Sequence, residues 1–70
     1  MNARLLITCR FPREEEYLLT EGYARDSLKI HVCEGLLTLD IDPNTNGAIY
    51  EISDLGLKKL AGESVPTFEV

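Results

Sequence analysis

The sequence has no tryptophan, one histidine and two cysteines among its 70 residues. Cys9 and Cys33 are too few for the disulfide framework of a small secreted domain. Together with His31 they also fall short of the four ligands that a structural zinc site takes. A catalytic nucleophile needs a base within hydrogen-bond reach, and we expect Cys33 to share the solvent face of a strand with His31. The sequence indicates no oxyanion hole or orienting residue for such a dyad, so a surface histidine is the expected interpretation. The sequence therefore predicts no enzyme activity, no metal and no cofactor.

Basic residues and long apolar runs are also scarce. Seven Lys and Arg stand against twelve Asp and Glu, a net charge of −5. Because nucleic-acid binding draws most of its affinity from Lys and Arg, this charge disfavours a nucleic-acid partner. A membrane helix needs about 20 apolar residues, and the apolar run near the N-terminus is soon interrupted by Arg10 without a signal-peptide pattern. We expect a cytoplasmic protein with free thiols and no membrane contact.

The remaining composition is typical of a folded domain, with 44% hydrophobic and 27% charged residues. Seventy residues make one domain, and a chain this short buries only about 60% of its unfolded surface. We expect an α+β domain over residues 1–63 and a C-terminal tail over residues 64–70. A core this thin favours a partner that covers part of the surface, and a second copy forming a homodimer is one candidate.

The first half of the chain alternates between apolar and polar residues in two places. Period two over residues 4–11 predicts a half-buried strand, which Pro12 ends. Residues 13–21 read as a short helix with glutamates in its first turn, and Gly22 is the expected left-handed end of that helix. Residues 28–33 alternate again, and the pair at 34–35 reads as a tight turn into a further strand.

The second half predicts a hairpin and a helix. Leu37–Ile41 and Ala48–Ile52 alternate on either side of residues 42–47, which are almost all turn formers. Ser53 is the expected N-cap of a helix over residues 54–61 that ends at Gly62. The prediction is thus a small single α+β domain in the order β-α-β-β-β-α, with an antiparallel meander and two short helices.

The turn at residues 42–47 has the oxygen side chains and glycine that open a calcium-binding EF-hand loop. The twelfth position of such a loop carries a bidentate glutamate, and here it is Ser53. The preceding residues also read as a strand instead of an incoming helix. We therefore expect the turn to connect two strands without a metal.

The acidic helix near the start of the chain is the expected contact surface. Glutamates at its solvent-facing start, followed by an aromatic and an aliphatic residue, make a surface for a protein partner. The residues predicted for that contact are Glu14, Glu15, Tyr17 and Leu18. The sequence therefore favours a small non-enzymatic regulatory protein that acts through protein–protein contacts, with an unknown partner.

A second interpretation comes from residues 35–63. Gly35-Leu36-Leu37 precedes the two-stranded hairpin, and the segment 50–56, which reads YEISDLG, opens the last helix. This pattern resembles the wing and final helix of winged-helix transcription regulators. The resemblance implies a DNA-binding regulator.

The residues that would lie near phosphates in such a regulator are Lys29, His31, Lys58 and Lys59. The same resemblance makes residues 28–34 the end of a recognition helix with Ser27 as its cap. The strict alternation and the β-branched residues of that segment favour a strand instead. The hairpin carries Asp40 and Asp42 and no basic residue, whereas a wing on phosphate is expected to be basic.

Overall fold

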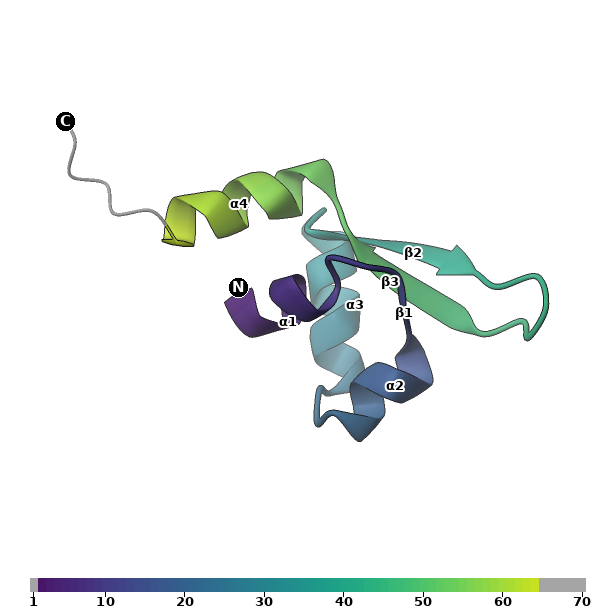
Figure 1. Ribbon diagram of the computed structural model, residues 1–70. Coiled ribbons are helices and arrows are strands. Elements are labelled where there is room, and N and C mark those ends of the chain that lie inside the picture. The colour runs from purple at the N-terminus through teal and green to yellow at the C-terminus, as the bar shows by residue number, and fades with distance from the viewer. Residues whose placement is uncertain (1, 65–70) are drawn as a thin grey trace, which may run out of the picture.

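The structure, a computed structural model, describes residues 2–64, which form four helices and a three-stranded antiparallel sheet (Figure 1). In chain order the elements are α1 (Ala3–Thr8), β1 (Arg13–Glu14), α2 (Glu15–Thr20), α3 (Arg25–Cys33), β2 (Leu37–Ile41), β3 (Ala48–Ile52) and α4 (Asp54–Ser64). The α+β class is confirmed. The predicted element order is wrong at three places: residues 4–11 and 28–33 supply helices instead of strands, and Arg13–Glu14, predicted as the start of a helix, form β1.

The first predicted strand is helix α1 instead. The Asn2 side chain caps it, since its Oδ1 accepts the Leu5 N–H at 3.2 Å. The neighbouring residues Leu5 and Leu6 are both fully buried, and so is Cys9. A half-buried strand would send Leu5 and Leu6 to opposite faces, whereas a helix directs all three side chains into one core. Phe11, which the alternation placed with Leu5, is 68% exposed.

The second predicted strand is helix α3. Leu28 and His31, one helical turn apart, are its buried residues. The residues predicted to form a hairpin turn end this helix: Gly35 takes φ +79°, Leu36 N–H donates to His31 O, and Gly35 N–H donates to Val32 O. This is a Schellman motif, and it satisfies carbonyls that the helix end leaves open. Gly22, at φ +103°, ends α2 in the same way, as predicted.

The hairpin has the predicted bounds. β2 and β3 pair antiparallel from Leu37 opposite Ile52 to Ile41 opposite Ala48. The sheet order is β1-β3-β2, so the third strand is the short β1, whose Arg13 lies opposite Tyr50. The predicted meander of three consecutive strands is wrong, because its first strand is α3.

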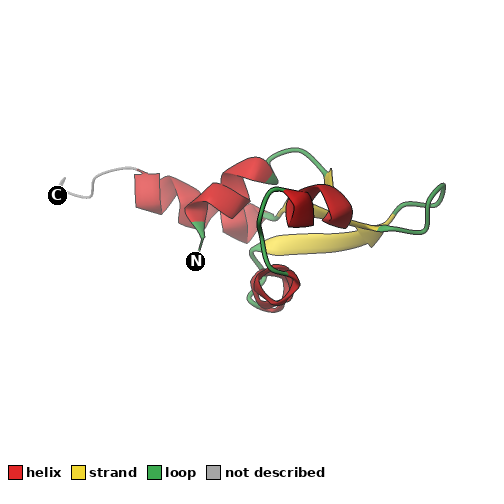
Figure 2. Ribbon diagram, turned by 90° about the horizontal axis from the view of Figure 1, so that it is seen from below, coloured by secondary structure: helices red, strands yellow, loops and turns green. Residues whose placement is uncertain are grey.

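The core lies between the helices and the base of the hairpin. Its buried apolar residues are Leu5, Leu6, Cys9, Leu18, Leu28, Leu36, Leu37 and Tyr50. The hairpin projects beyond the helices in both views (Figures 1 and 2). Of the predicted buried face of β2 only Leu37 is therefore buried, whereas Leu39 and Ile41 are 50% and 53% exposed.

The last helix begins where predicted. The Ser53 Oγ accepts the Gly56 N–H at 3.0 Å, which confirms the N-cap. The Ser53 N–H donates to the Leu36 carbonyl and its hydroxyl to the Gly35 carbonyl, so the cap joins α4 to the end of α3. The predicted stop at Gly62 is wrong, because α4 continues to Ser64. The rest of the predicted tail, residues 65–70, lies outside the described residues.

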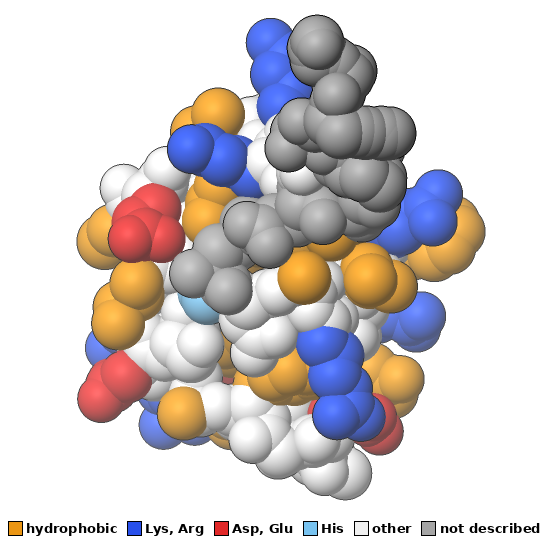
Figure 3. Space-filling view, turned by 90° about the vertical axis from the view of Figure 1, so that its left-hand side faces the viewer, with side chains coloured by type: hydrophobic (Ala, Val, Ile, Leu, Met, Phe, Trp, Pro, Cys, Tyr) orange, Lys and Arg blue, Asp and Glu red, His pale blue; other side chains and the backbone are white. Residues whose placement is uncertain are grey.

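The two ends of the molecule differ in character. α1 and α4 pack together at the end opposite the hairpin (Figure 1). Figure 3 shows that end, where hydrophobic side chains are separated from one another by Lys, Arg and other surface. Within residues 2–64 no helix combines the length and the apolar character needed to cross a bilayer.

Candidate functional site

The predicted contact residues at the start of α2 have different environments. Leu18 is fully buried and cannot meet a partner, so this part of the prediction is wrong. Its position three residues into a short helix faces the core, where it packs with the other buried leucines. Tyr17 is 43% exposed, and the Arg13 guanidinium lies 5.0 Å from the centre of its ring. Glu14 is exposed.

The Glu15 side chain contacts two other elements of the fold. Its Oε2 accepts the Tyr50 hydroxyl at 3.1 Å and lies 3.5 Å from the Arg25 Nε. Burial raises the pKa of Tyr50, and the hydrogen bond and the charge of Glu15 raise it further. The carboxylate thus connects α2 to β3 and to the start of α3, and a partner would have to compete for it.

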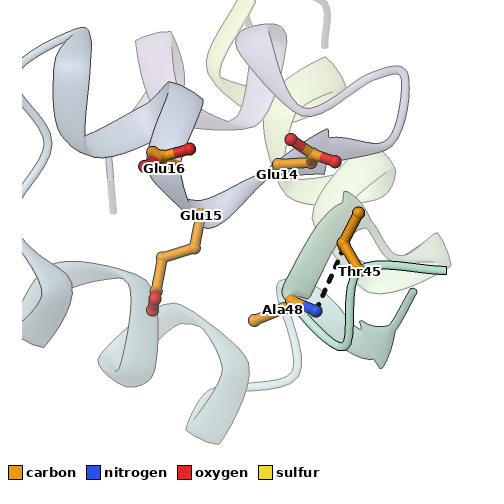
Figure 4. A pocket seen from close by; sticks show the side chains of 6 residues that line it. Glu14, Glu15, Glu16, Thr45 and Ala48 are labelled. Atoms are coloured by element: carbon orange, nitrogen blue, oxygen red, sulfur yellow. Dashed lines mark hydrogen bonds between the residues drawn. The ribbon is translucent and has the colours of Figure 1, made fainter. Parts of the chain in front are cut away.

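A hollow of about 310 Å³ lies between the start of α2 and the tip of the hairpin. Glu14, Glu15 and Glu16 line one side, and Thr45, Gly47 and Ala48 line the other (Figure 4). The Glu15 side chain points away from the other two glutamates. Among the described residues no three acidic, cysteine or histidine side chains come together as metal ligands. The hollow is acidic and open, without a convergent ligand set.

The residues predicted to lie near phosphates differ in their exposure to solvent. Lys29 is exposed on α3, and Lys58 and Lys59 are exposed on α4. His31 is only 5% exposed, so its predicted place on the surface is wrong. Its Nδ1 lies 2.6 Å from the Ser27 carbonyl, and its Nε2 accepts the Asn2 N–H at 3.0 Å. Because both ring nitrogens are bonded within the protein, His31 joins α3 to α1 and does not serve a ligand.

The two thiols offer no reactive pair. Cys9 and Cys33 are both free, the first buried and the second exposed. Burial raises the pKa of the Cys9 thiol to about 11, against a smaller opposing effect of Arg13. A thiol nucleophile works as the thiolate, so Cys9 is inert at neutral pH.

A further exposed surface is formed by residues of α3 and of the β2–β3 hairpin, hereafter the α3–hairpin surface. Its apolar members are Ile30, Leu39 and Ile41, each at least half exposed. Its exposed charged residues are Arg25, Asp26, Lys29 and Glu34, two basic and two acidic. Asp40 and Glu51 are also exposed, but they lie on the opposite face of the hairpin from Leu39 and Ile41.

Sequence reasoning missed these apolar residues as a surface. The alternation assigned Leu39 and Ile41 to the core, and Ile30 to the buried face of a strand. A helical interpretation of residues 28–33 would have placed Ile30 away from Leu28 and His31 and exposed it. No family model, no curated protein and no solved structure matches the chain.

Proposed function

We propose that this protein is a small, non-enzymatic binding module that contacts another protein through the α3–hairpin surface. The observation that carries the proposal is the exposure of Ile30, Leu39 and Ile41, at 55%, 50% and 53%, on a surface without an excess of basic residues. Single exposed apolar residues are common, but apolar residues that share one exposed face, as Leu39 and Ile41 do on β2, are typical of protein contacts. A cytoplasmic location, where both thiols stay reduced, is part of the proposal.

The architecture supports a winged-helix-type module. The three helices before the hairpin and the helix after it agree with the helices, wing and final helix that the resemblance of residues 35–63 implies. In that interpretation α3 is the recognition helix and the hairpin is the wing. We propose that α3 and the hairpin bind a protein in place of DNA.

The charges favour protein over DNA as the partner. The carboxylates of Asp26 and Glu34 offset Arg25 and Lys29 on the surface that would face a duplex. Arg25 is also paired with Glu15. Counterions are released from DNA only where a Lys or Arg side chain neutralises a phosphate. A surface with few free cations therefore gains little binding free energy from the DNA backbone. The buried His31 supplies no contact either.

DNA binding is the second candidate, favoured by the exposed Lys29 on α3 and by the winged-helix order of the elements. Lys58 and Lys59 on α4 are the further cations that the resemblance implies. A transcription regulator of this kind would bind a duplex with an affinity that falls by roughly 10³ or more between about 50 and 200 mM salt if six or more phosphates were contacted.

One substitution separates the two candidates. Ile30→Lys removes an apolar contact and adds a cation to α3. If the surface binds protein, a photoreactive residue at position 39 forms a protein adduct that Ile30→Lys removes and that Leu57→Lys on α4 leaves in place. If it binds DNA, Ile30→Lys strengthens binding to a duplex and Lys29→Ala weakens it, both measured by fluorescence anisotropy over the salt series. Salt-dependent duplex binding without a protein adduct would overturn the first proposal.

A further inference from the structure

β2 is an edge strand of five residues. The Asp42 N–H donates to the Gly47 carbonyl at 2.9 Å, which sets the phase of the antiparallel ladder. Because hydrogen-bonded and non-hydrogen-bonded pairs alternate, Thr38 and Asp40 turn their backbone groups toward β3. Leu37, Leu39 and Ile41 turn theirs to the outer edge of the sheet.

Most of that edge is unpaired. The Ile41 N–H is bonded to the side chain of the preceding residue, the Asp40 Oδ1, at 2.9 Å. Within residues 2–64 the outward N–H and C=O of Leu39 have no hydrogen-bond partner. An open edge beside half-exposed apolar side chains is a template for another strand.

We propose that β2 pairs antiparallel with β2 of a second copy of this chain, with Leu39 on the two-fold axis. This inference rests on the proposed function and names the partner of the α3–hairpin surface. The two sheets join into one six-stranded sheet, and each copy supplies the same residues to the contact, as a two-fold interface requires.

The side chains select this register. With Leu39 on the axis, Leu37 lies opposite Ile41 of the second copy, so the face that Leu37, Leu39 and Ile41 share becomes one continuous apolar strip. On the other face Thr38 lies opposite Asp40. An axis at Asp40 would instead place two carboxylates directly opposite each other, which is destabilising.

The backbone allows the same register. Leu39 and its counterpart exchange two N–H···O=C bonds, and the Leu37–Ile41 pairs supply the others. The Ile41 N–H must leave the Asp40 carboxylate to take part. One strand pairing with few side chains lies at the low end of interface sizes, so we expect a dissociation constant of roughly 10–100 µM.

Disulfide trapping tests the register directly. In the background Cys33→Ser, which removes the exposed thiol, Leu39→Cys places two thiols in a hydrogen-bonded pair with Cα atoms about 5.5 Å apart. That separation lies within the span of a disulfide. Thr38→Cys is the matched control, because its two copies lie on either side of the axis at about 8 Å. We expect a covalent dimer from Leu39→Cys and little from Thr38→Cys; equal yields, or none, overturn the register.

Sedimentation equilibrium of the unmodified chain tests the association. We expect the mass to rise with concentration, and Leu39→Glu to weaken the dimer by about tenfold or more because two carboxylates meet at the axis. Leu57→Glu, on α4, is the control that leaves the dimer unchanged. A chain that stays monomeric up to about 1 mM, or a dimer abolished only by Leu57→Glu, overturns the pairing. A monomer that still forms the Ile30-dependent adduct with a different protein overturns the pairing alone and leaves the proposed function intact.

Discussion

Gly56→Ala is expected to destabilise the protein strongly. A Cβ at position 56 would lie 2.3 Å from the Leu36 carbonyl oxygen and 2.7 Å from Ile52 Cγ1. Carbon and oxygen atoms in close contact keep about 3.3 Å, so the start of α4 would have to move by about 1 Å. The Leu36 carbonyl also accepts the Ser53 N–H at 3.0 Å, and this movement lengthens that bond. The clash therefore acts on a backbone group that cannot rotate away.

The magnitude follows from three contributions. Overpacking costs about 1–3 kcal/mol, and the weakened hydrogen bond costs about 1 kcal/mol. Alanine recovers about 1 kcal/mol of helix propensity. We expect a net loss of about 2 kcal/mol, or a shift of about 1–2 M in the urea midpoint measured by circular dichroism.

Gly62→Ala is the matched control in the same helix. Nothing lies within 4 Å of a Cβ at position 62, so only the propensity gain remains. We expect this variant to be as stable as the unmodified chain, or up to about 1 kcal/mol more stable. If Gly56→Ala and Gly62→Ala have the same urea midpoint, the close approach of α4 to Leu36 is refuted.

Four further predictions follow from buried or constrained residues. His31→Ala removes two hydrogen bonds and leaves a cavity, so it is expected to cost about 2–3 kcal/mol in chemical unfolding, whereas Lys29→Ala on the same helix changes the stability by less than about 0.5 kcal/mol. Gly22→Ala is expected to cost about 1 kcal/mol or more, because φ +103° strains any other side chain even where space is open. Iodoacetamide is expected to label Cys33 and spare Cys9 in the folded chain, and mass spectrometry showing two labels would contradict the burial of Cys9. Because the pKa of Cys9 is raised from 9.0 to about 11 on folding, its effect on the unfolding free energy is constant below pH 9 and turns destabilising as the pH rises toward 11.

The hairpin and the start of α4 were predictable because their signals are local. Turn formers at residues 42–47 and the cap at Ser53 act on the backbone within a few residues, and tertiary packing agrees with them. The extent of the core was not predictable in this way. Leu39 and Ile41 have the same pattern as Leu37, but the helices cover only the base of the hairpin.

The two missed helices share one physical cause. In a short segment, apolar residues at alternate positions fit a strand, but neighbours at spacings of three and four fit a helix equally well. Leu28 and His31 form the buried helical pair of α3, and Leu5 and Cys9 form that of α1. A histidine taken as polar and exposed hid the first pair, and the cap at Asn2 was not recognised. The α3–hairpin surface includes the same segment. Because α3 was not predicted as a helix, the exposure of Ile30 was not predicted either.

The free edge of β2 needs an explanation whatever the partner is. Natural proteins blunt such edges with charges, bulges or covering elements, because an apolar edge strand recruits other chains. Here the protection is partial: the Asp40 carboxylate accepts the Ile41 N–H, and the Leu39 backbone stays open between the buried Leu37 and the half-exposed Ile41. A single carboxylate of this kind limits pairing to registers that keep it away from a second carboxylate. The exclusion of registers that oppose two carboxylates is what would distinguish the proposed pairing from unspecific aggregation.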